Sequence, residues 1–119
     1  MAEHNKLGEK GEQLAVDYLL KHDYKIVVRN YRYLKAEVDI IARKGNMLAV
    51  VEVKTRSTEE FGNPKDFIKP KKIKLMTMAV DHFVVENDLD VEVRFDIIAI
   101  VKKENAFQIE HLEDAFLHF

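Results

Sequence analysis

The sequence predicts a single α/β domain with a central mixed sheet flanked by helices, in the order helix, three strands, helix, two strands. Two strand-like stretches flank Gly45-Asn46, a dipeptide typical of a two-residue β-hairpin loop. Apolar residues recur with helical period over residues 6–22 and 70–87. Residues 91–101 are almost continuously apolar in their second half, as expected for a strand buried on both faces. A chain of 119 residues is the size of one domain.

The first predicted helix, residues 6–22, places Glu12 at the edge of its apolar stripe. The stripe consists of Leu14, Ala15, Tyr18 and Leu19. Gly8 and Gly11 precede Glu12 and weaken the helix, but they let a neighbouring backbone or a substrate approach closely. A glutamate near a helix start also has an ordinary explanation, because it complements the helix dipole.

A short strand is predicted over residues 24–28, and basic and aromatic residues alternate over 29–33. Such alternation can bind nucleic acid through charge and stacking. Residues of this kind also simply pack at a sheet edge with their charged ends in solvent.

The hairpin over residues 36–56 carries the most informative residues. Counting outward from the two-residue loop pairs Asp39 with Glu52, and Lys54 then emerges on the same face. A loop of odd length would put the two carboxylates on different faces, so the prediction depends on this turn. The opposite face is apolar and is expected to pack on a helix; it comprises Val38, Ile40, Ala42, Ala49, Val51 and Val53.

Opposed carboxylates at Asp39 and Glu52 would repel each other and therefore favour a cation between them. Mg²⁺ is usually held by one or two carboxylates, with water and phosphate oxygens as its other ligands. Lys54 would stand beside the ion as a point charge suited to phosphate. The alternative is the solvated face of an amphipathic hairpin with ordinary ion pairing. Apolar neighbours on that same face, including Ile41 and Val50, indicate partial burial and favour a site.

A loop over residues 57–69 leads to Pro70, a typical first helical residue, and the helix is expected to end near Asn87. Four lysines crowd its start: Lys69, Lys71, Lys72 and Lys74. The helix dipole prefers acids there, but free N–H groups at a helix start also attract anions. We therefore expect these lysines and Arg56 to bind nucleic-acid phosphates. A right-handed crossover should then place strand 91–101 parallel to the hairpin, with a last strand within 107–119.

Net charge is −2, but the charge is unevenly distributed. Residues 54–74 hold seven Lys or Arg against three Asp or Glu, and residues 75–119 hold three against ten. A basic strip suits phosphate binding, although a charge run is equally often a solvated surface. The five histidines lack zinc-ligand spacing and are expected at the surface: His4, His22, His82, His111 and His118.

The chain contains no cysteine, which fits a reducing cytoplasm and excludes thiolate metal sites. Its apolar runs are much shorter than the roughly 20 residues of a membrane helix, and no signal peptide is visible. We expect a cytoplasmic protein without membrane contact.

Glu37-Val38-Asp39 followed by Glu52-Val53-Lys54 resembles the D…ExK core of the PD-(D/E)xK nuclease superfamily, which has the restriction-endonuclease-like fold. More narrowly, the Gly-x-x-Gly-Glu-x-x-Ala-x-x-Tyr-Leu string over residues 8–19 is similar to the YraN-like family (uncharacterised protein family 0102), distant relatives of Holliday junction resolvases.

Further along the chain, Arg94-Phe95-Asp96 resembles a motif of unknown role in the YraN-like family. Ala36 departs from the family, which commonly has glycine there, and this change concerns only a close backbone approach.

This resemblance implies a Mg²⁺-dependent endonuclease, with Mn²⁺ as a substitute, acting on DNA, including branched or junction DNA. Asp39, Glu52, the Val53 carbonyl and Glu12 would hold the metal, and Lys54 would orient the nucleophile or stabilise the phosphorane. Junction cutting would require a two-fold homodimer.

Two other classes of function stay open on the sequence. One is a catalytically silent nucleic-acid-binding module that uses the lysine strip and Arg56. The other is a protein-interaction adaptor that uses the acidic C-terminal half. Retention of Asp39, Glu52 and Lys54 favours the enzyme, because a binding module has no need of opposed carboxylates.

Overall fold

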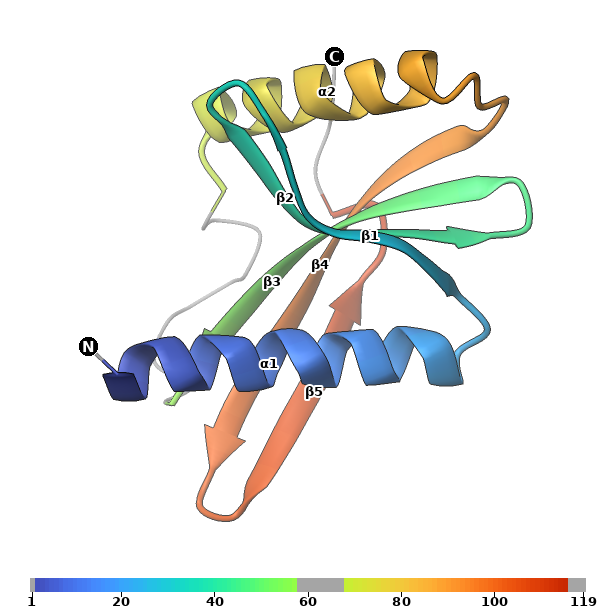
Figure 1. Cartoon of the computed structure of the whole chain (residues 1–119). Coiled ribbons are helices and arrows are strands. Elements are labelled where there is room, and N and C mark those ends of the chain that lie inside the picture. The colour runs from blue at the N-terminus through green and yellow to red at the C-terminus, as the bar shows by residue number, and fades with distance from the viewer. Residues whose placement is uncertain (1, 58–67, 116–119) are drawn as a thin grey trace.

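A computed structural model describes residues 2–57 and 68–115, with side chains from residue 6 onward. Its elements are, in chain order, α1 (Ala2–Lys21), β1 (Lys25–Tyr33), β2 (Ala36–Lys44), β3 (Met47–Arg56), α2 (Pro70–Glu86), β4 (Glu92–Lys103) and β5 (Ala106–Leu112). This order confirms the predicted α/β arrangement (Figure 1).

The five strands form one mixed sheet in the order β1-β2-β3-β4-β5. Neighbouring strands are antiparallel except for β3 and β4, which are parallel and are joined through α2. The predicted hairpin loop is confirmed: Gly45 has a φ of +60°, and β2 pairs with β3 from Lys44↔Met47 to Ile40↔Val51. Such a positive φ is easily adopted by glycine.

Each face of the sheet is covered by one helix (Figure 1). The cluster under α1 includes Ala15, Leu19, Ile40, Val51 and Ile98. The cluster under α2 includes Ile41, Val50, Met76, Phe83 and Phe95. The apolar residues expected beside the two carboxylates therefore belong to a fully buried core, and not to a solvated hairpin face.

Val38 corrects the predicted apolar face of the hairpin. It was expected beside Ile40, but it packs in the cluster under α2 while Ile40 lies under α1. The β2–β3 pairing reaches only Ile40↔Val51, and beyond it β2 stays paired with β1, as in Tyr31↔Val38. We attribute the change of face to β2 following the twist of β1 after it parts from β3.

The two largest differences in element bounds concern the start of α1 and the end of β1. Helix α1 begins at Ala2 instead of residue 6, and β1 continues to Tyr33 instead of ending at residue 28. A register shift between Ile26 and Val28 lets the basic and aromatic residues pair with β2. In this position Tyr31 packs edge-on against Phe83 with ring centroids 5.2 Å apart, which supports the packing interpretation of that segment.

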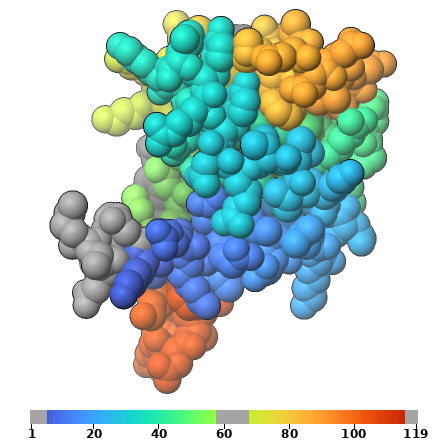
Figure 2. Space-filling view, viewed as in Figure 1, coloured from blue at the N-terminus to red at the C-terminus, as the bar shows by residue number. Residues whose placement is uncertain are grey.

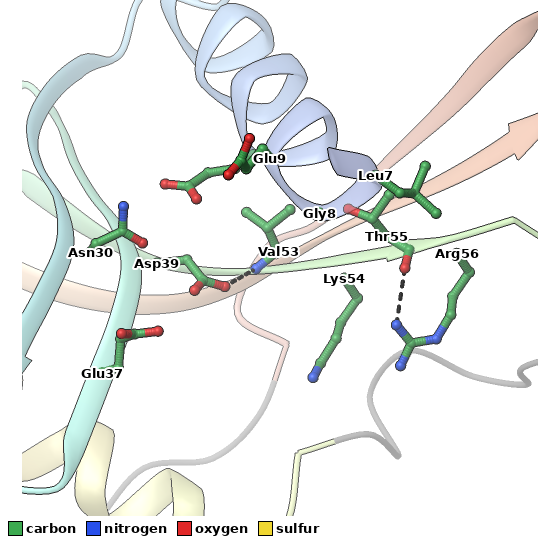
Figure 3. A pocket seen from close by; sticks show the side chains of 11 residues that line it. Leu7, Gly8, Glu9, Asn30, Glu37, Asp39, Val53, Lys54, Thr55 and Arg56 are labelled. Atoms are coloured by element: carbon green, nitrogen blue, oxygen red, sulfur yellow. Dashed lines mark hydrogen bonds between the residues drawn. The ribbon is translucent and has the colours of Figure 1, made fainter. Parts of the chain in front are cut away.

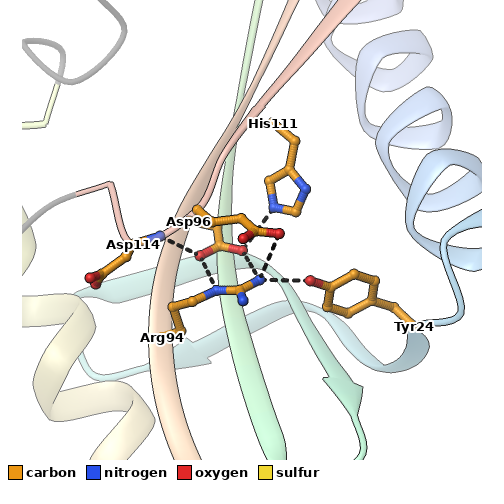
Figure 4. Close-up of polar contacts among 6 residues, drawn as sticks. Tyr24, Arg94, Asp96, His111 and Asp114 are labelled. Atoms are coloured by element: carbon orange, nitrogen blue, oxygen red, sulfur yellow. Dashed lines mark hydrogen bonds and ion pairs between the residues drawn. The ribbon is translucent and has the colours of Figure 1, made fainter.

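A buried polar cluster centred on Asp96 of β4 connects that strand to β5 and to Tyr24, which precedes β1 (Figure 4). Arg94 and His111 both bond Asp96, whose side chain is fully buried, and Arg94 also donates to Tyr24 Oη. The Asp114 N–H donates to the same carboxylate at 3.0 Å. His111 was expected at the surface; its side chain is instead 6% exposed, because Asp96 satisfies its ring nitrogen.

The β4–β5 hairpin projects beyond α1 (Figure 2). Within residues 2–57 and 68–115, neither helix combines the length and apolar character that a membrane crossing requires.

Candidate active site

Asp39 and Glu52 meet where β2 and β3 part. Beyond Ile40↔Val51 the strands are no longer paired, and the Asp39 carboxylate turns towards β3 to accept a hydrogen bond from the Val53 N–H at 2.8 Å (Figure 3). Glu52 is 2% exposed, and its charge acts on the neighbouring Asp39 carboxyl group. The structure thus brings the two predicted carboxylates together, but at a fork in the sheet instead of in a ladder pair.

Burial is the largest cause and the neighbouring charge of Glu52 the second largest of a rise in the pKa of Asp39 to about 7. The Val53 N–H and Lys72 act in the opposite direction without offsetting this rise. Two carboxylates this close cannot both be charged cheaply in a buried position. Near neutral pH the pair is therefore most stable when it either shares a proton or binds a cation.

Two lysines contact Glu52 from different elements. Lys54 on β3 lies 3.4 Å from Oε2, and Lys72 on the first turn of α2 lies 2.5 Å from the same oxygen. Oε1 is buried and, within the described part of the chain, has no hydrogen-bond partner. A buried carboxylate oxygen without a partner is costly, and a bound cation would remove that cost.

The α1 side of this fork opens into a pocket of about 410 Å³ (Figure 3). Its walls comprise Leu7, Gly8, Glu9, Glu12, Asn30, Glu37, Asp39, Val53, Lys54, Thr55 and Arg56. Glu12 lies in this wall, but its Oε1 is 3.4 Å from Arg29 Nε. Arg56 also lines the pocket and donates to the Thr55 carbonyl at 2.9 Å.

Gly11 sets how closely α1 approaches this site. A Cβ at position 11 would lie 2.9 Å from Thr55 Cβ on β3, which is closer than real side chains come. A Cβ at Gly8 would meet no described atom within 4 Å. The close approach predicted for this glycine pair therefore belongs to Gly11.

A second pocket of about 480 Å³ lies beside the start of α2. It is lined by Lys35, Ala36, Glu37, Lys69, Lys71, Lys72, Leu75 and Met76. Three lysines of the predicted strip thus surround an apolar floor, while Lys74 is exposed and does not line this pocket. Glu37 lines both pockets, so they adjoin.

The model of the family described as "Uncharacterised protein family UPF0102" matches residues 11–100. The chain belongs to this family. A UPF0102 protein of Christiangramia forsetii is 63% identical over the full length of both chains. A relative from Flavobacterium psychrophilum is 57% identical over the full length of both chains. A relative from Bacteroides fragilis is 48% identical over 98% of this chain and 96% of its own.

In this UPF0102 chain the donor set at the fork suits a hard cation. The carboxylates of Asp39 and Glu52 supply oxygen atoms of the kind that Mg²⁺ prefers as ligands. Val53 lines the same pocket as Asp39. Within residues 2–57 and 68–115, no three Asp, Glu, His or Cys side chains are grouped to hold one ion. Glu12 therefore stands in the pocket wall beside the pair, not in a shared cluster with it.

Sequence reasoning placed Lys72 on the phosphate-binding strip and missed its contact with Glu52. It also missed Glu9, Asn30 and Lys35, which line the two pockets. A crossover helix starts near the end of the preceding strand, which gives the approximate place of Lys72. The sequence does not predict which lysine of the helix points towards the carboxylates, because a connection as long as residues 57–69 does not fix the rotation of the helix about its axis.

Proposed function

We propose that this protein is a metal-dependent nuclease that hydrolyses phosphodiester bonds in nucleic acid, with DNA as the expected substrate. The observation that supports it best is the Asp39–Glu52 pair, in which Asp39 is half-buried and Glu52 is buried with one carboxylate oxygen that lacks a partner among the described residues. Lys54, two residues beyond Glu52 on the same strand, completes the resemblance to the PD-(D/E)xK core. The family name itself states no activity.

Each residue at the fork has a role in this proposal. Asp39 and Glu52 would hold Mg²⁺ or Mn²⁺ together with the Val53 carbonyl, and Glu12 would act through water. The bound ion would supply Lewis acidity, which neutralises charge on the phosphate and acidifies water. Lys54 would orient the attacking water or stabilise the phosphorane. The oxygen of this water bonds to phosphorus as one ester P–O bond breaks, and the leaving oxygen takes up a proton.

The second pocket, beside the start of α2, is called the basic pocket. It would hold the nucleic-acid backbone next to the reacting phosphate. Lys69 and Lys71 line it, Arg56 lines the adjoining pocket, and Lys74 is exposed nearby on α2. Point charges on flexible stems bind phosphates without reading sequence. Branched DNA would present equivalent phosphates on two strands, and its cleavage by this protein would require a homodimer.

The proposal is tested by cleavage of branched, duplex and single-stranded substrates with and without Mg²⁺ or Mn²⁺. We expect wild type to cut at least one substrate only with the ion, and Glu52→Ala to lose at least about 100-fold in rate. Glu110→Gln, which removes an exposed carboxylate on β5, should cut as wild type does. Cleavage that survives Glu52→Ala would refute the assignment.

One observation favours a catalytically silent binding module as the second candidate. Two lysines already contact Oε2 of Glu52, so the pair is partly neutralised without a metal. This module would bind nucleic acid through the basic pocket and cut no substrate with either ion. If lysine substitutions leave nucleic-acid binding unchanged as well, the adaptor function becomes the one to pursue.

A further inference from the structure

Lys72 lies between the basic pocket and the carboxylate pair. It is the third residue of α2, it lines the pocket, and its Nζ contacts Glu52 Oε2. The Lys72 side chain is 42% exposed, whereas that of Glu52 is 3% exposed. One end of this ion pair is therefore fixed and buried, and the other is a flexible stem open to solvent.

The charge of Lys72 also acts on the other carboxylate. Its ammonium group opposes the upward shift in the pKa of Asp39 that burial and Glu52 cause. Lys72 thus interacts with both carboxylates that would hold a divalent ion. A metal arriving at the pair would meet an ammonium group already in attractive contact with one of its ligands.

We propose that Lys72 is a displaceable cation that competes with the divalent metal for Glu52 and moves to a phosphate when nucleic acid enters the basic pocket. This inference rests on the proposed metal site. Its consequence is that the metal and the nucleic acid bind cooperatively, because each favours the state in which Lys72 has left Glu52. Such a coupling is reciprocal: each ligand tightens the other by the same factor.

The chemistry of lysine suits this role. An ammonium group on a four-carbon stem pairs equally well with a carboxylate or a phosphate oxygen, and it can move between them without moving the helix. Lys69, Lys71 and Lys35 line the same pocket and would attract the incoming phosphate. Lys54 would stay beside Glu52, since it is held on β3 within the carboxylate's own strand.

Mn²⁺ titration of the metal-free full chain, followed by calorimetry, tests the competition. We expect Lys72→Met to bind Mn²⁺ roughly tenfold more tightly than wild type, within the usual range of such couplings. Lys72→Gln should behave similarly and serves if the methionine variant fails to fold. Lys72→Arg keeps the charge and should stay near wild type. Lys71→Met is the matched control, because Lys71 lines the same pocket and forms no described ion pair with Glu52.

A second arm measures the coupling directly with a single-stranded oligonucleotide whose linkages are all phosphorothioate, so that it resists cleavage. At an oligonucleotide concentration that saturates all three proteins, it should tighten Mn²⁺ binding to wild type and to Lys71→Met by several-fold more than to Lys72→Met. The comparison between the two lysine variants removes the general attraction of Mn²⁺ to the oligonucleotide.

The possible failures are distinguishable. If wild type binds Mn²⁺ and both neutral Lys72 variants bind it equally or more weakly, the competition is wrong while the nuclease proposal stands. If folded wild type and folded variants all fail to bind Mn²⁺, both proposals fall. An equal effect of the oligonucleotide on all variants would show that Lys72 does not couple the two ligands.

Discussion

At the residue scale, Asp39 decides the chemistry of the fork. Burial and the charge of Glu52 raise its pKa to about 7, so in the metal-free protein it takes up a proton that the unfolded chain would release near pH 4. An acid with a raised folded pKa contributes stability at low pH, and this contribution is lost as pH rises through the folded pKa.

We therefore predict that Asp39 makes the metal-free protein less stable as pH rises from about 4 to 7, by up to about 4 kcal/mol. Asp39→Asn mimics the protonated form and should remove this part of the slope, so that the variant is the more stable protein at pH 8. Chemical denaturation of both proteins across this range measures it. A wild type and variant with parallel pH profiles would contradict the raised pKa.

The same residues show what the sequence can and cannot reveal at this scale. The register from Lys44↔Met47 to Ile40↔Val51, which brings Asp39 and Glu52 near each other, follows from the even-length loop at Gly45-Asn46, because strand alternation propagates locally. The parting of β2 and β3 beyond Ile40↔Val51 has no such local signal. The contact of Lys72 with Glu52 depends on how α2 docks, which no local pattern encodes. His111 was misplaced for a similar reason: its partner Asp96 lies on another strand.

At the element scale, the approach of α1 to β3 depends on the missing side chain at Gly11. We predict that Gly11→Ala destabilises the protein by about 1–3 kcal/mol, because Thr55 must move or α1 must shift. Gly8→Ala should instead be neutral or stabilise by up to about 1 kcal/mol, since its Cβ would meet no described atom within 4 Å. Thermal unfolding of the two variants tests the contrast. Equal effects would mean that α1 does not pack against Thr55 as described.

The start of α2 carries the expected contacts with nucleic acid. Neutralising Lys69, Lys71 and Lys74 together should weaken binding to all sequences alike and reduce the log–log salt slope by up to about 0.9 per lost phosphate contact. Lys54→Ala should leave binding nearly intact while removing cleavage, because Lys54 faces the carboxylates. Fluorescence anisotropy at several salt concentrations separates these effects. An unchanged slope in the triple variant would place the binding surface elsewhere.

The type and order of the elements were predictable because hydrophobic period and turn residues are local signals. The extension of β1 to Tyr33 was not, because its basic and aromatic residues form a strand only through pairing with β2. Propensity and pattern gave no sign that Arg29 would turn to Glu12 of α1. Tertiary contacts decided both features.

At the scale of the whole molecule, the cluster around Asp96 joins β4, β5, Tyr24 just before β1 and the segment after β5 (Figure 4). Burial acts to raise the pKa of Asp96, but hydrogen bonds from His111, Arg94 and the Asp114 N–H outweigh it and lower the pKa. An acid with a lowered folded pKa contributes stability that is present above its ordinary pKa and lost as pH falls through the folded value.

We predict that Asp96→Asn costs roughly 3–5 kcal/mol at neutral pH, because it leaves Arg94 without its buried counter-charge. The variant should also lose less stability than wild type when the pH falls below about 4. Denaturant unfolding at pH 7 and pH 3 checks both statements. A cost below about 1 kcal/mol would mean that the cluster does not hold the sheet together.

Calorimetric titration of Mn²⁺ or Mg²⁺ into the metal-free protein at pH 8 tests directly whether Asp39 and Glu52 hold one divalent ion. We expect one ion per chain in wild type and in Glu110→Gln, and a loss of at least about tenfold in affinity in Asp39→Asn and in Glu52→Gln, since each removes a ligand charge. Equal affinity in wild type and in both fork variants would contradict the claim.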